Sequence, residues 1–287
     1  MRLEDQRKVF SERDGLHRAR KWAFCVPLLI GVGMCGVFAH DLFLKLDTYF
    51  LKPGTRATVK LLNGTFQTSD GIVRRERLRD ARVVLPGGDV VRPSAEQWRD
   101  EAQTTMLDIE TKGAGTYVVG VSTAPREIEL RAKDFNEYLA HDGLPDTLAE
   151  RRRRGELNKD VRERYSKHVR AILQVGDERT DDYKTLLGYP VEIVPVSNPY
   201  ALRPGQVLEV LFLKDGKPVA DQFMLAGYEL NGRLSREISA RTDRNGVARF
   251  RLRSRGKWYV KTIHMTRVSE PHLDYESKWA TLTFELR

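Results

Sequence analysis

The sequence has few of the residues that form disulfides, bind metals or carry out covalent catalysis. It contains 2 cysteines and 6 histidines in 287 residues, and both cysteines, Cys25 and Cys35, precede residue 40. The chain from His40 onward therefore offers no disulfide and no thiolate metal site. Nucleophile-elbow, phosphate-loop, dinucleotide-binding and paired-histidine zinc motifs are missing too. These absences favour a binding protein over an enzyme.

Charge of one sign is not concentrated in any long stretch. Lysine and arginine outnumber aspartate and glutamate by 49 to 40, and the two signs are interleaved. The run 151–154 is all arginine, but Glu150 and Glu156 flank it within a stretch of helical character. A solvated helix face explains this run better than a nucleic-acid surface does. We therefore expect no nucleic-acid partner.

Long hydrophobic runs are also lacking, apart from one near the N-terminus. Residues 23–38 are apolar, follow a basic cluster at 17–21, and lead to Val37-Phe38-Ala39. This arrangement predicts a secretory signal over residues 1–39 with cleavage after Ala39, and hence a periplasmic protein. The run is shorter than the ~20 residues that span a bilayer comfortably. The alternative is that this segment stays uncleaved and anchors the protein in the inner membrane. In either case we expect contact with the membrane only through this segment.

Short apolar runs separated by Gly, Pro and Asn turns dominate the rest of the chain. They predict an N-terminal β-sandwich over 40–132 and a C-terminal immunoglobulin-like sandwich over 185–287. The expected strands are 42–46, 49–51, 57–62, 81–85 and 117–121 in the first sandwich, and 191–196, 207–213, 218–220, 222–230, 247–252, 258–264 and 279–286 in the second. The fold class is therefore mainly β, with two antiparallel sandwiches after a signal helix.

A charged stretch between the two sandwiches has helical character. Residues 133–177 are rich in Glu, Arg, Lys, Ala and Leu, which predicts a short helical connector. One helix is expected from Lys133 to His141. A second is expected from Asp146 to Leu173, broken near Gly155 and capped again at Asn158. His141 and His168 are expected to be surface residues.

His40 has a special chemical position if cleavage follows Ala39. The new N-terminus would then combine an α-amine of pKa near ~8 with an imidazole, and both groups bind transition metals. His264 is the best second ligand, since it is a lone histidine at the end of an apolar, aromatic strand. His272 and Glu276 in the following segment are weaker candidates. The competing interpretation is that His40 only begins a strand and that His264 is a buried, hydrogen-bonded histidine.

Several blocks of sequence resemble a known family. The blocks are residues 40–44, 164–167, 173–177, 187–195, 198–200, 242–246, 258–265 and 275–284. They are similar to a periplasmic family of domains of unknown function grouped with nickel and cobalt uptake components (NikM-like and CbiK-like). The C-terminal part also resembles carboxypeptidase-regulatory and transthyretin-like domains, which implies fold alone.

This resemblance implies a role in nickel or cobalt uptake, with a membrane metal transporter as partner. Together with the signal segment and the missing catalytic motifs, it leads us to expect an exported, non-enzymatic metal-binding protein. His40 and His264 would be the main metal ligands, with Glu276 and His272 in support. A copper carrier with an N-terminal histidine chelate is the first alternative, because amine and imidazole ligands favour copper. A metal-free adhesion or scaffold module is the alternative from a different class.

Overall fold

Strands dominate the chain in the computed structural model, which describes residues 40–287. The predicted signal over 1–39, including Cys25 and Cys35, lies outside the described residues. Within the described part, no helix is long and apolar enough to cross a membrane. The prediction of a mainly β protein is confirmed, and only two α-helices are present among residues 40–287.

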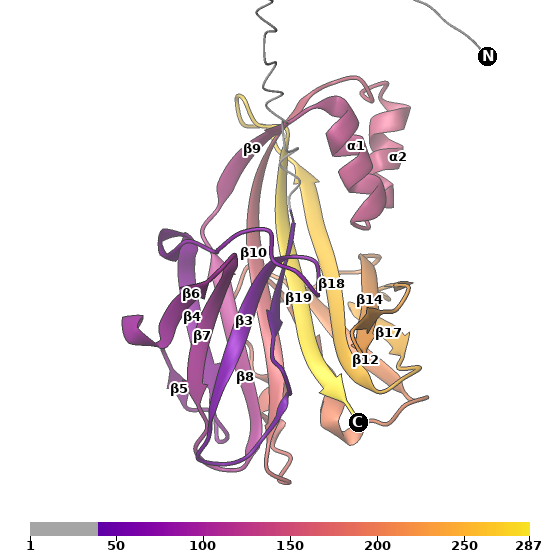
Figure 1. Cartoon of the computed structure of the whole chain (residues 1–287). Coiled ribbons are helices and arrows are strands. Elements are labelled where there is room, and N and C mark those ends of the chain that lie inside the picture. The colour runs from indigo at the N-terminus through magenta and orange to yellow at the C-terminus, as the bar shows by residue number, and fades with distance from the viewer. Residues whose placement is uncertain (1–39) are drawn as a thin grey trace, which may run out of the picture. The chain divides into compact units, whose positions relative to one another are not determined.

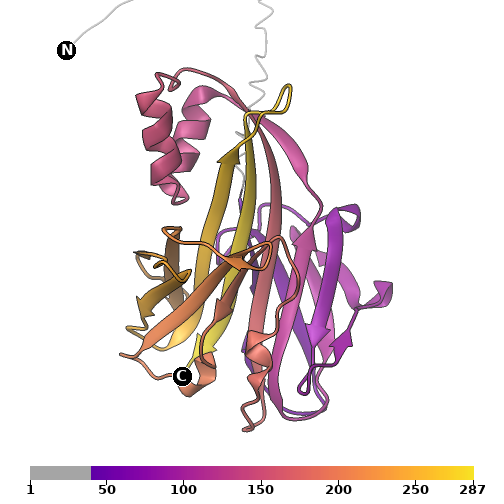
Figure 2. The same cartoon turned by 180° about the vertical axis from the view of Figure 1, so that it is seen from behind.

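The largest sheet has eleven strands, built around β10 (Val161–Val175), β18 (Gly256–Arg267) and β19 (Tyr275–Leu286). The others are β2 (Phe50–Leu51), β4 (Leu78–Val84), β5 (Val90–Val91), β8 (Gly115–Thr123), β9 (Arg126–Leu130), β14 (Phe223–Leu230), β15 (Arg233–Leu234) and β16 (Ile238–Arg241). Their order is β15-β14-β18-β19-β10-β8-β4-β5, with β16 beside β14, and β2 and β9 beside β10. Figures 1 and 2 show the three long strands side by side.

Two smaller sheets pack on the large one. The first contains β1 (Asp41–Lys45), β3 (Arg56–Gly64), β6 (Trp98–Glu101) and β7 (Thr104–Glu110), and the second contains β11 (Val191–Pro195), β12 (Val207–Lys214), β13 (Lys217–Pro218) and β17 (Val247–Arg251). One core of buried residues draws on all three sheets, including Leu44, Val169 and Phe212. The two sandwiches therefore share the large sheet, which β10 makes continuous by pairing with β8 on one side and β19 on the other.

Strand β10 corrects the predicted connector. The prediction of a helix through Leu173, capped at Asn158, is wrong, because residues 161–175 form this strand. Every residue from 166 to 175 is buried. The reason is that β1 packs on one face of β10 and β11 packs on the other. A strand covered on both faces loses the alternation of polar and apolar residues that would identify it.

The charged residues of β10 also differ from their prediction. His168, expected at the surface, is only 4% exposed. Arg170 is buried as well, and it forms an ion pair with the buried carboxylate of Glu192 on β11. Burial of charge requires such partners. Because the partner lies in another sheet, the sequence of β10 taken by itself resembles the polar face of a helix.

Two helices cover one end of the long strands (Figures 1 and 2). They are α1 (Ala132–His141) and α2 (Pro145–Arg153), so the expected helix from Lys133 to His141 is confirmed. Arg151 corrects the solvated-face interpretation of its run, since it is 1% exposed and donates to the Asn136 side chain. Short 3₁₀ turns complete the chain: η1 (Arg75–Arg77), η2 (Ala95–Gln97), η3 (Asp181–Lys184) and η4 (Pro199–Ala201).

Candidate functional site

Strand β1 is fixed against one face of the large sheet by side chains of β19. The hydroxyls of Thr281 and Thr283 donate to the backbone carbonyls of Leu42 and Leu44, at 2.8 and 2.6 Å. All four residues are buried, including the two threonines with their polar hydroxyls. Buried hydroxyls require such partners. These bonds set the position of His40, the residue immediately before the strand.

His40 is held at its backbone and leaves its imidazole accessible. The ammonium of Lys167 on β10 donates to the His40 carbonyl. The His40 side chain is 37% exposed, and its Nδ1 lies 3.3 Å from the carboxylate of Asp70. Imidazole and carboxylate are both ligands for divalent transition metals. The predicted metal-binding histidine is therefore next to a second group of the appropriate chemistry.

A cluster of carboxylates lies next to His40, around the ammonium of Lys261. Lys261 Nζ lies 2.7 Å from Asp41, 3.4 Å from Glu237 and 3.7 Å from Asp142, and its side chain is 10% exposed. His40 and these four residues line a pocket of about 470 Å³. With three carboxylates to one ammonium, the pocket has an excess of negative charge when all are ionised.

The electrostatics of the cluster follow from this crowding. Burial works to lower the pKa of Lys261, but the charges of Asp41, Glu237 and Asp142 outweigh it and raise that pKa. Burial, together with the charge of Asp41, raises the pKa of Asp142 to about 7. Near neutral pH the cluster can therefore gain or lose one proton at Asp142. An added cation would favour the ionised form.

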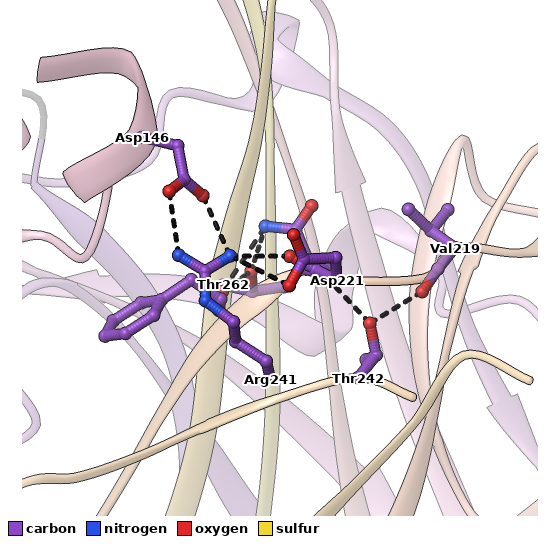
Figure 3. A network of polar contacts seen from close by, with 8 residues as sticks. Asp146, Val219, Asp221, Arg241, Thr242 and Thr262 are labelled. Carbon is purple, nitrogen blue, oxygen red and sulfur yellow. Dashed lines mark hydrogen bonds and ion pairs between the residues drawn. The ribbon is translucent and has the colours of Figure 1, made fainter. Parts of the chain in front are cut away.

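The turn between α1 and α2 places Asp142 in the pocket. Gly143 follows it with φ +81°, a left-handed conformation that suits glycine. Asp146 at the start of α2 then accepts two hydrogen bonds from Arg241 on β16, at 2.8 and 2.9 Å, as Figure 3 shows. Arg241 also donates to Asp221. A bidentate pair fixes orientation as well as distance, so this contact anchors the turn that carries Asp142.

The structure places His264 away from His40. Side chains alternate between the two faces of a strand, and Lys261 of β18 points to the face on which β1 lies. His264, three residues later, points to the other face, where its Nδ1 lies 2.9 Å from Gln222 and its ring packs near Phe212. Burial, and then the charges of two nearby lysines, lower its pKa. The structure does not bring these two predicted ligands together.

His272 and Glu276 do not join His40 either. His272 is exposed in the loop between β18 and β19, with φ +65°. Glu276 shares the His264 face, since the register aligns Thr266 with Glu276, and its carboxylate accepts from Lys278. In residues 40–287, no three His, Cys, Asp or Glu side chains form a group that could hold a metal ion. Any site at His40 therefore needs a further ligand.

Sequence reasoning found His40 but missed the groups around it. Asp70, Asp142 and Glu237 lie in three separate segments of polar sequence, and nothing in their neighbourhoods distinguishes them from surface residues. Lys261 did carry a signal, because it is a lone charge within the apolar strand 258–263. A lysine in that position predicts a buried carboxylate partner, although it cannot identify which one.

Comparison with known proteins gives a family and several distant structural similarities. Residues 37–266 match DUF4198, a domain of unknown function. No curated protein matches the chain. Solved structures with some similarity include the D0-D1 domain of intimin (15% identity, 85% of this chain and 97% of that one, TM-score 0.22). Another is FdeC, an adhesin of Escherichia coli (13% identity, 87% of this chain and 65% of that one, TM-score 0.23). A third is the human OSCAR ligand-binding domain (11% identity, 84% of this chain and 96% of that one, TM-score 0.18). At such TM-scores these similarities support no conclusion.

Proposed function

We propose that this chain, which belongs to the DUF4198 family of domains of unknown function, is an exported periplasmic protein that binds a divalent transition metal at His40. We propose nickel or cobalt as the metal and a membrane metal transporter as the partner that receives it. The observation that carries the proposal is the pairing of the His40 imidazole with Asp70 at 3.3 Å, beside a pocket rich in carboxylates.

The missing ligand would come from cleavage after Ala39. A free α-amine on His40 and the Nδ1 atom of its own imidazole can close a six-membered ring with one metal ion. Nδ1 is also the atom that faces Asp70. The amine, the imidazole and this carboxylate would then supply three ligands, with a fourth position left for solvent or a transfer partner. Neither His264 nor Glu276 is needed in this arrangement.

The neighbouring carboxylates favour cation binding without being ligands. Asp41, Asp142 and Glu237 surround Lys261 with an excess of negative charge, and the His40 side chain opens to the same pocket. A field of this sign raises the local concentration of cations. Because the Lys261 ammonium already occupies the centre of the cluster, the metal is expected at its edge, near His40.

The test is metal titration of the secreted protein after mass spectrometry has identified its first residue. Nickel, cobalt and copper are titrated separately by calorimetry. We expect binding to weaken at least tenfold in His40→Ala and in a form with an added Met before His40, and to weaken severalfold in Asp70→Asn. His141→Ala and Asp89→Asn serve as controls on exposed residues.

The outcomes separate the alternatives. Tighter binding of copper than of nickel or cobalt, with the same dependence on His40, would identify the copper carrier. Loss of affinity in His264→Ala but not in Asp70→Asn would refute the site described above. No binding of any of the three metals to a protein that begins at His40 would leave the metal-free envelope scaffold.

A further inference from the structure

A second pocket lies on the other side of β1 and has the opposite charge. Its volume is about 380 Å³, and Leu42 lines it, whereas Asp41 and Phe43 line the acidic pocket. Alternation along β1 accounts for this division. Four cationic side chains line the second pocket, with a single carboxylate: Arg74, Arg77, Arg126 and Lys167, with Glu76. The pocket therefore has an excess of three positive charges.

One of these cations, Lys167, is buried, and a second, Arg77, is partly buried. Lys167 is 6% exposed, and its ammonium bonds to two neutral oxygens, the Asn63 amide at 2.8 Å and the His40 carbonyl. It forms no ion pair with any described residue.

Arg77 is short of a hydrogen-bond partner in the same pocket. Its Nε is buried with no acceptor, and only one terminal nitrogen bonds, to the Ala124 carbonyl at 3.0 Å. The guanidinium lies 5.4 Å over the ring of Tyr165, which holds it in place. Unpaired buried donors are rare in folded proteins. Among the described residues Arg77 has no carboxylate partner, and its second terminal nitrogen makes no hydrogen bond, so that nitrogen is available to an external acceptor.

We propose that this pocket binds a small organic anion through a carboxylate or phosphate group. The acceptors of such a group match the unused donors of Arg77 and the charge of Lys167. Arg126, exposed at the pocket, adds charge that would favour ligands with more than one anionic group. Apolar atoms of Leu42 and Ile72 would contact a short carbon skeleton. This inference does not depend on metal binding at His40.

The test is calorimetry on protein that a chelating resin has first freed of metal. Citrate, succinate and inorganic phosphate are titrated separately. Arg77→Gln should weaken binding about tenfold or more, since it removes charge-assisted hydrogen bonds. Arg126→Gln should weaken binding severalfold and should fold normally, because the residue is exposed. Arg179→Gln is the control, since Arg179 is exposed and lies outside the pocket.

The pattern of results decides the matter. Preference for citrate and succinate over phosphate assigns a carboxylate ligand, and the reverse assigns a phosphate ligand. Equal loss of affinity in all three variants would mean that only diffuse surface charge is involved, and would overturn the proposal. Failure of every anion to bind at millimolar concentration would overturn it as well. Metal affinity at His40 is measured separately, so either proposal can fail alone.

Discussion

Replacing Glu163 by glutamine removes a buried ionisable group that forms no ion pair with any described residue. Glu163 on β10 is fully buried, beneath α1. One carboxylate oxygen accepts hydrogen bonds from Ser277 and from Tyr138, the latter at 3.3 Å, and the other has no partner. Burial outweighs these bonds and raises the pKa of Glu163 from 4.5 to about 7. The folded protein therefore holds this group neutral at mildly acidic pH.

The direction of the pH effect follows from this shift. Because the pKa is higher in the folded than in the unfolded chain, stability from the neutral Glu163 is fully present below about pH 4.5 and is lost as pH rises through about 7. A shift of this size corresponds to about 3 kcal/mol. Glutamine keeps the shape and cannot ionise. The wild type should therefore lose about 2 kcal/mol of unfolding free energy between pH 5 and pH 8 that Glu163→Gln does not lose, so the difference between them shifts in favour of the variant.

Urea denaturation at the two pH values measures this difference. Tryptophan fluorescence is a suitable signal, because the Trp279 indole donates to Ser277 at 3.0 Å beside Glu163. Glu178→Gln is the matched control, since Glu178 is exposed and its replacement should change stability by less than about 0.5 kcal/mol at either pH. A stability difference for Glu163→Gln that does not grow with pH would refute the assignment of a neutral, buried carboxyl.

Three further perturbations test other contacts. Lys261→Met leaves three carboxylates without their ammonium and should destabilise the protein by about 3 kcal/mol at pH 8. Urea denaturation should show a smaller loss at pH 5, and an equal loss at both pH values would contradict the assignment of three carboxylates to this cluster. Arg170→Met should cost about 3 kcal/mol, because it leaves the buried Glu192 carboxylate without its cation. Adding Glu192→Gln removes that charge but keeps an acceptor for the N–H groups of Leu187 and Gly188, and should recover part of the loss; additive losses in urea denaturation would argue against the pair. Gly227→Ala should raise the unfolding rate and lower the unfolding free energy by about 1 to 3 kcal/mol, because a Cβ there would lie 2.5 Å from the Tyr259 hydroxyl. Unchanged unfolding kinetics would show that the Tyr259 side chain can move aside.

The strands bounded by turn residues could be predicted from sequence alone. Val191–Pro195, Val207–Lys214 and Gly256–Arg267 each coincide with an expected strand, because apolar runs between Gly, Pro and Asn turns depend on local chemistry. The short helix Ala132–His141 was predicted for a similar reason, since its apolar positions recur at helical spacing. The edge strand β6 and its neighbour β7 were missed, because charged residues interrupt the alternation of polar and apolar side chains.

Strand β10 shows why the rest could not be predicted. Glu163, Lys167 and Arg170 resemble the polar face of a helix when only neighbours in sequence are considered. In the folded chain they are buried, and their partners are contributed by residues far away, such as Glu192 and Ser277. Whether a charge can be buried depends on the group opposite it. That group is determined by the packing of sheets.

The candidate site divides in the same way. The sequence by itself determined that His40 follows an apolar run ending in Ala39, and that few other metal-binding side chains exist, since these are properties of order and composition. Only the tertiary structure decided that Asp70 and three carboxylates stand near His40 while His264 points to the opposite face of the sheet. Strand alternation and sheet pairing set these positions, and both depend on contacts between residues that are distant in the chain.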